Sequence, residues 1–131
     1  RFPETLKLHP FDENFVHPLY AAADFLLMPS RFEPCGLSQM MAQRYGTLPV
    51  AWRTGGLADT ILDAREHPPG DGLFLHELSA KGLSDAVEAA LALLADGELH
   101  AKSRTAAMSR DSSWDRAIGH YLQLFRDLLK S

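Results

Sequence analysis

Between residues 25 and 75, short apolar runs alternate with helix-forming segments, and this alternation restricts the fold most. A short uninterrupted apolar run, such as Phe25–Met28, is typical of a buried parallel strand. Strands that alternate with helices predict a parallel sheet with right-handed crossovers, an α/β fold with helices flanking the sheet. The predicted strands are Phe25–Met28, Leu48–Trp52 and Gly72–Leu75, and the predicted helices run from about Leu37 to Tyr45 and from Leu57 through Ala64.

Two further elements are predicted before this unit. Thr5–Leu8 alternates polar and apolar residues like a short strand. Glu13–Ala23 carries apolar residues at helical spacing, with Asp12 as its N-cap candidate. Pro18 lies inside that pattern and predicts a late start or a kink.

After Ser79 the pattern predicts helices alone. One apolar stripe extends from Leu83 to Leu94, and Leu99–Met108 predicts a shorter helix. A last helix over residues 113–130 begins at Ser112–Ser113, where a serine can cap it. Its apolar side chains follow at helical spacing, so this helix needs a packing partner.

Composition excludes several classes of protein. Thirteen basic and 17 acidic side chains give a net charge of −4, which does not favour nucleic acid or an anionic membrane as a partner. The single cysteine, Cys35, excludes an internal disulfide framework, and the six dispersed histidines predict no metal site. Neither a signal peptide nor a transmembrane-length apolar run is visible, so the cytoplasm is the expected location. The chain begins at Arg1 without an initiator Met, and we expect it to be part of a longer protein.

Two glycine-containing loops follow predicted strands and therefore project from the same edge of the sheet. They are Pro29–Ser38 and Arg53–Leu57. Glycines at positions 36, 55 and 56 would let backbone amides approach an oxygen-rich ligand, and Ser38 adds a hydroxyl donor at a helix N-terminus. Together with the carboxylate of Glu33, these residues predict a phosphate and sugar site. Ordinary turn glycines, and Glu33 as a partner of the helix dipole, are the alternative.

The same loops carry long consecutive motifs. These are the stretches Pro29–Leu37, Arg44–Val50 and Arg53–Thr60, followed late in the chain by Ser113-Trp114-Asp115. Together they resemble bacterial glycogen synthase and its plant relatives, the starch synthases. The resemblance extends over almost the whole chain.

This resemblance implies a GT-B enzyme, in which two Rossmann-like domains face each other across a cleft. Such enzymes transfer glucose from ADP-glucose to the non-reducing end of an α-1,4-glucan with retention. Residues 1–131 resemble part of the C-terminal, donor-binding Rossmann-like domain, including the C-terminal helix over residues 113–130. The N-terminal acceptor domain is absent and would be the partner of this chain, which we expect to be inactive alone. The resemblance implies no cofactor.

The resemblance also implies roles for individual residues. Glu33 matches the acidic residue beside the donor glucose and is the predicted catalytic residue. Met41 stands where related glycosyltransferases have a second glutamate, so we assign no covalent nucleophile. The predicted substrate-binding residues are Cys35, Gly36 and Leu37 through their amides, Ser38 at the pyrophosphate, and Thr54 and Gly55, which shape the same pocket.

Several alternatives remain open from the sequence. The chain could serve another GT-B glycosyltransferase or a sugar-nucleotide epimerase with a different donor, or a non-enzymatic nucleotide- or glucan-binding module. Cys35 is either a reactive thiol or a small packing residue. Arg31 and Arg53 either reach a phosphate or glucan or are solvated at the surface. Trp114, on the apolar stripe of a helix, is expected in the core rather than on a sugar.

Overall fold

The computed structural model describes residues 5–10 and 12–130. Its centre is a parallel sheet in the order β1 (Phe25–Met28), β2 (Leu48–Trp52) and β3 (Leu73–Leu75). Leu27 pairs with Val50 and Ala51 with Phe74, so all three strands run in the same direction. The predicted α/β fold with a parallel sheet is confirmed.

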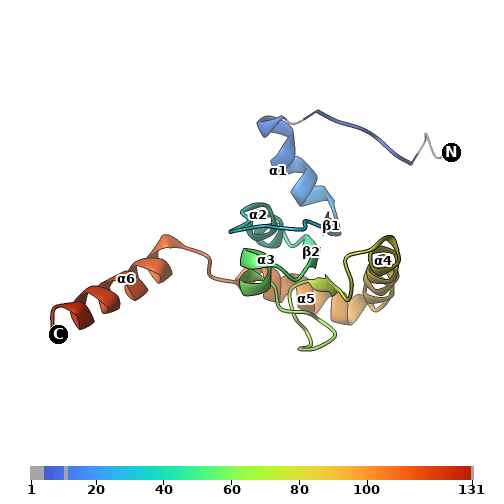
Figure 1. The fold of residues 1–131 in the computed structure, drawn as a ribbon. Helices are drawn as coiled ribbons and strands as arrows, with labels where there is room; N and C mark the ends of the chain where they lie inside the picture. The colour runs from blue at the N-terminus through green and yellow to red at the C-terminus, as the bar shows by residue number, and fades with distance from the viewer. Residues whose placement is uncertain (1–4, 11, 131) are drawn as a thin grey trace.

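Helices connect the strands and complete the chain (Figure 1). The central strand β2 contacts α2, α4 and α5, and α4 also packs against β3. Their bounds are α1 Glu13–Ala22, α2 Ser38–Arg44, α3 Gly55–Thr60, α4 Ala80–Ala95, α5 Gly97–Ser109 and α6 Trp114–Leu128. All six lie where the sequence predicted helices, within a few residues at each end.

The sheet is covered on both faces because its side chains alternate. Leu48 and Val50 on β2 belong to a cluster with small and apolar side chains of α4 and α5. Ala51 and Phe74 point to the opposite face, where they pack with Leu57 of α3. These two clusters hold the carboxyl ends of the strands in place beneath the loops that follow them.

Both predicted helix caps, Asp12 and Ser113, are present, and Ser79 provides a third that the sequence analysis did not identify. The Asp12 carboxylate accepts a hydrogen bond from the amide of Asn14, and the hydroxyls of Ser79 and Ser113 accept from amides two to three residues into their helices. The helix α1 begins at Glu13 and continues through Pro18, so the predicted late start is wrong.

Two strand predictions require correction. Residues 5–10 form no strand, since no other strand lies beside them in the described part of the chain, and Leu8 is 88% exposed. The strand β1 is parallel as predicted but not buried, because β2 is its only strand partner among the described residues and Leu27 remains 49% exposed. A strand at a sheet edge keeps one side open to solvent.

Two helix predictions also differ from the structure. The helix α3 ends at Thr60 instead of Ala64, because Ile61 is extended and Asp63 forms a parallel bridge with Gly72. Trp114 is 77% exposed rather than buried, and none of the described residues of α6 is buried. Figure 1 shows why: α6 projects away from the sheet.

Candidate functional site

The two glycine-containing loops leave the carboxyl ends of β1 and β2 and lie against each other. The amide of Gly56 donates to the carbonyl oxygens of Glu33, at 3.0 Å, and Pro34, at 3.2 Å. The prediction that both loops project from one edge of the sheet is therefore confirmed. We call the segment Glu33–Ser38 the donor loop, after the role predicted for it from the sequence, and Thr54–Leu57 the second loop.

The glycines of the second loop are explained by this contact. A Cβ at Gly56 would lie 2.5 Å from the carbonyl carbon of Cys35 and 2.7 Å from its Cα, closer than real Cβ atoms come. Gly55, with φ of +43°, places its Cβ position against the carbonyl of Glu33. The donor loop fills the space where these side chains would lie, so the packing of the two loops by itself requires glycine at both positions.

The predicted ligand-binding side chains of the donor loop lie at the surface. Cys35, Leu37 and Ser38 are exposed, and Glu33 is half-buried. No described residue hydrogen-bonds or ion-pairs with the Glu33 carboxylate or the Ser38 hydroxyl, so both groups are available to a ligand. The helix α2 begins at Ser38, as predicted, and Leu37 before it provides no side-chain cap.

A fully buried glutamine supports the donor loop from within, and the sequence analysis missed it. The carboxamide nitrogen of Gln39 donates to the carbonyl oxygens of Gly36, at 2.8 Å, and Cys35, at 3.2 Å, and to the Thr60 hydroxyl at 2.9 Å. The Thr60 hydroxyl donates in turn to the carbonyl oxygen of Gly56 at 2.5 Å. These bonds connect the donor loop, α2 and α3 in one network.

Gly36 belongs to the same network. Its φ is +70°, a conformation that side-chain-bearing residues rarely adopt, and a Cβ there would lie 2.7 Å from the carboxamide nitrogen of Gln39. A glycine at position 36 is therefore required both by the turn and by the glutamine beside it.

A buried carboxylate fixes the chain beyond α3. The carboxylate of Asp63 accepts bonds from the amide and the guanidinium of Arg65 and, at 2.7 Å, from the amide of Phe74 on β3. Burial opposes ionisation of this carboxyl, but these hydrogen bonds and the charge of Arg65 outweigh it and lower the pKa of Asp63. The charge is therefore kept, and it ties the segment after α3 to the sheet.

A second buried carboxylate lies at Asp71. It accepts from the amide of Leu62 at 2.6 Å and from Arg110 after α5 at 2.8 Å. Burial raises the pKa of Asp71, while the bond from Leu62 and the charge of Arg110 limit the rise. Gln43, one turn after Gln39 on α2, donates to the carbonyl oxygens of Thr60 and Asp71.

Arg53, one candidate for phosphate binding, has protein partners instead. One guanidinium nitrogen lies 2.7 Å from both carboxylate oxygens of Glu66, and the group stacks 4.3 Å from the centre of the Phe74 ring. The surface alternative is thus favoured for Arg53, although the side chain remains half-exposed. Trp52 is partly buried against the core beneath it.

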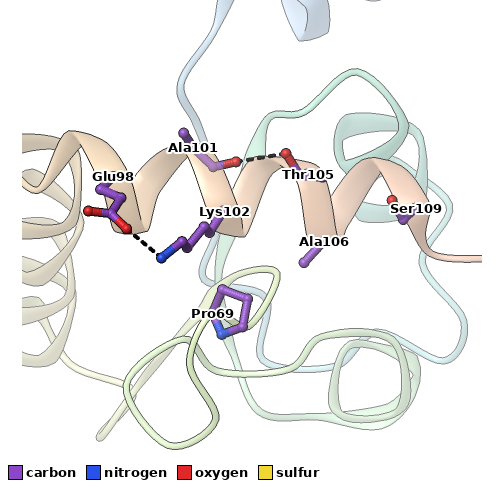
Figure 2. Close-up of a pocket in the computed structure, with 7 residues that line it drawn as sticks. All are labelled: Pro69, Glu98, Ala101, Lys102, Thr105, Ala106 and Ser109. Atoms are coloured by element: carbon purple, nitrogen blue, oxygen red, sulfur yellow. Dashed lines mark hydrogen bonds and ion pairs between the residues drawn. The ribbon is translucent and has the colours of Figure 1, made fainter.

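Two cavities found among the described residues do not lie at the junction of the loops. One, of about 730 Å³, lies between α2 and the connection from α5 to α6, and Leu37 is the only predicted site residue in its wall. The other, of about 490 Å³, lies along α5 (Figure 2). Figure 2 shows that polar groups on its wall already have partners: Lys102 donates to Glu98, and the Thr105 hydroxyl donates to the carbonyl of Ala101.

Metal and membrane features are not found in the described residues. These residues contain no group of three or more histidine, cysteine, aspartate or glutamate side chains that could hold a metal ion. Within the same ranges, every helix is too short or too polar to cross a membrane.

The chain is similar to a known protein family and to several characterised relatives. The sequence profile of a family described as glycosyl transferases group 1 matches residues 3–95. A glycogen synthase from Thioalkalivibrio sulfidiphilus is 44% identical over 134 residues, covering 98% of this chain and 28% of the relative. A glycogen synthase 2 from Geobacter metallireducens is 49% identical over 117 residues, covering 88% of this chain and 24% of the relative.

A solved structure is similar over nearly the same range. The catalytic domain of starch synthase IV from Arabidopsis thaliana, bound to ADP and acarbose, superimposes with a TM-score of 0.81 at 33% identity. The match covers 95% of this chain and 26% of that structure. The chain thus spans about a quarter of the length of the proteins that it matches.

Proposed function

The chain belongs to the glycosyl transferases of group 1, and we propose that it forms the donor-binding part of a retaining glucosyltransferase. The reaction transfers glucose from ADP-glucose to the non-reducing end of an α-1,4-glucan. Similarity to glycogen synthases supports this choice. So does the solved starch synthase, whose bound ADP and acarbose correspond to a nucleotide and a glucan-like sugar.

The observation that carries this proposal is the junction of the two loops. A free carboxylate and a free hydroxyl belong to one loop at the carboxyl edge of a parallel sheet, where α/β proteins bind ligands, and the exposed residues Cys35 and Leu37 lie between them in sequence, on either side of the buried Gly36. The Gln39 network holds the carbonyl groups of Cys35 and Gly36 from below, so the backbone of the donor loop is oriented before a ligand arrives. Preorganised groups need little rearrangement when charge develops in a reaction.

The groups of the two loops have separate roles in the proposed reaction. The carboxylate of Glu33 accepts hydrogen bonds from hydroxyls of the donor glucose and orients the sugar. The amides of Cys35, Gly36 and Leu37, with the hydroxyl of Ser38, contact the sugar and the diphosphate. Thr54 and Gly55 shape the same pocket from the second loop.

In this reaction the protein mainly has to position the donor and the acceptor and to stabilise the charge on the leaving group. As the bond between C1 of glucose and the phosphate oxygen breaks, negative charge moves onto the ADP leaving group. Amide and hydroxyl donors at the start of α2 stabilise that charge, and a 4-hydroxyl of the glucan adds to C1 on the same face as its proton passes to the departing phosphate oxygen. We assign no protein nucleophile, because Glu33 is the only carboxylate of the donor loop.

The cleft in this proposal needs a second, acceptor-binding domain, in the two-domain GT-B arrangement. Matching about a quarter of the relatives' length supports that requirement. We therefore expect the 131-residue chain to be inactive alone and active within an enzyme of full family length in the cytoplasm.

The test is glucose incorporation into glycogen by the full-length enzyme, with ADP-glucose, UDP-glucose and GDP-mannose compared as donors. We expect ADP-glucose to be used best and Glu33→Gln to lower kcat/KM by about 10²-fold or more. The matched control is Glu98→Gln, whose carboxylate only pairs with Lys102 on the surface of α5, and it should leave the rate unchanged. If the enzyme prefers another donor, ADP-glucose is not its substrate. A wild-type rate for Glu33→Gln would refute the role of that residue.

A further inference from the structure

Gln39 has an unusual position for a long polar side chain, because it is fully buried directly beneath the donor loop. Its relative exposure is 0%, and its carboxamide lies between α2, the donor loop and α3. Burying an amide is costly unless it is hydrogen-bonded, and here the amide nitrogen makes every bond while the amide oxygen has no partner among the described residues. The position of those bonds therefore indicates what the residue does.

The bonds of Gln39 converge on the backbone that would touch a donor. Two N–H groups serve three acceptors, namely the carbonyl oxygens of Cys35 and Gly36 and the hydroxyl oxygen of Thr60. Each carbonyl group lies in one peptide plane with the amide of the next residue, so holding two successive carbonyl groups fixes two peptide planes. The amides of Gly36 and Leu37 belong to those planes, so the direction in which they point depends on Gln39.

Thr60 extends this control to the second loop. Its hydroxyl accepts from Gln39 and donates its own hydrogen to the carbonyl oxygen of Gly56, at 2.5 Å. The amide of Gly56 donates back to the carbonyl oxygen of Glu33. The closed path from Glu33 through the second loop, Thr60 and Gln39 back to Gly36 sets the spacing of both loops.

We propose that Gln39 is a positioning residue of the donor site, which acts through the donor-loop carbonyls and Thr60 to aim the amides that bind the sugar diphosphate. It touches no substrate. This inference rests on the proposed function for its effect on catalysis, but its effect on loop geometry can be measured without any substrate.

The chain provides a matched control in Gln43. This glutamine lies one turn further along α2, is 1% exposed, and also donates to Thr60, but through the Thr60 carbonyl. Its other acceptor is the carbonyl of Asp71, and it makes no bond to the donor loop. Gln39→Met and Gln43→Met each replace a fully buried glutamine of α2 by methionine, so the two variants match in size and burial and differ in which backbone the lost hydrogen bonds held.

The first measurement is amide hydrogen exchange of Gly56 in the 131-residue chain, since that amide bonds the donor loop directly. We expect Gln39→Met to speed its exchange at least tenfold relative to Gln43→Met. Thr60→Val should have the same effect through loss of the hydroxyl, and Thr60→Ser should restore wild-type exchange. Equal exchange rates in the two glutamine variants, or an unchanged rate in Thr60→Val, would overturn the inference.

The second measurement is the donor dependence of the full-length enzyme. We expect kcat/KM for ADP-glucose to fall about tenfold to a hundredfold in Gln39→Met, while KM for glycogen and the rate of Gln43→Met stay within about twofold of wild type. Should Gln39→Met fail to fold, Thr60→Val with Thr60→Ser as rescue makes the same comparison. Matching losses in the two glutamine variants would refute the positioning role, whereas an inactive wild-type enzyme would refute the proposed function and leave the exchange result to decide the loop geometry.

Discussion

Gly56→Ala tests the loop junction directly, because it adds a single methyl group where two backbones meet. The new Cβ would lie 2.5 Å from the carbonyl carbon of Cys35, whereas carbon atoms in contact prefer about 3.5 Å or more. The donor loop and the second loop must therefore move apart by roughly 1 Å. That movement also stretches the bond from the Gly56 amide to Glu33.

The sign of the stability change separates this account from ordinary helix propensity. Gly56 lies in α3, and alanine in place of a helical glycine normally stabilises by about 0.5–1 kcal/mol. Overpacking costs about 1–3 kcal/mol, and the weakened backbone bond adds about 1 kcal/mol. We expect a net loss of about 2 kcal/mol in the free energy of unfolding.

Urea denaturation of the chain and donor kinetics of the full-length enzyme are the assays. A displacement of about 1 Å in a catalytic site can cost about 10²-fold, so we expect kcat/KM for the donor to fall by about that factor. The control is Gly119→Ala in α6, where a Cβ meets nothing within 4 Å, and it should be neutral or stabilising. A Gly56→Ala variant that is as stable as Gly119→Ala and keeps its donor kinetics would refute the reasoning.

The remaining predictions concern stability. Asp63→Asn should cost about 1–3 kcal/mol in the free energy of unfolding, because the new amide N–H would face buried donors. Since folding lowers the pKa of Asp63, the wild type has this stability above about pH 4 and loses it as the pH falls through the folded pKa. Unfolding measured from pH 7 to pH 3 should therefore show a weaker acid dependence in the variant. Arg110→Ala should cost about 3 kcal/mol at pH 7 by leaving the Asp71 carboxylate buried without its cation. That cost should shrink near pH 4 as Asp71, whose pKa burial raises, takes up a proton, and a constant cost would argue against it. Ser79→Ala should cost about 1 kcal/mol in urea denaturation by removing the cap of α4, and no change would show that solvent replaces the cap.

Local signals in the sequence were sufficient to predict the elements that position the site. The apolar runs at Phe25–Met28 and Leu48–Trp52 form parallel strands, and the predicted caps Asp12 and Ser113 mark the starts of α1 and α6. Because parallel strands share a carboxyl edge, the approach of the two loops followed from the order of elements alone. The ligand-binding roles of Glu33 and Ser38 remain predictions.

Features that depend on distant partners could not be predicted. Gln39 reads as a helix former, and only its bond to Thr60, 21 residues away, reveals that it supports the donor loop. The buried carboxylate of Asp71 likewise depends on Arg110, 39 residues further along the chain. Alternation predicted a strand at Thr5–Leu8, but a strand exists only where another lies beside it.

A crystal structure of the full-length enzyme with ADP-glucose tests the central claim most directly. The account predicts that the diphosphate lies within hydrogen-bonding distance of the amides of Gly36 and Leu37 and the hydroxyl of Ser38, with the Glu33 carboxylate on the glucose hydroxyls. The Gln39 carboxamide should remain bonded beneath the loop, out of contact with the donor. A donor bound in the cavity between α2 and residues 107–113, with the loop junction empty, would contradict it.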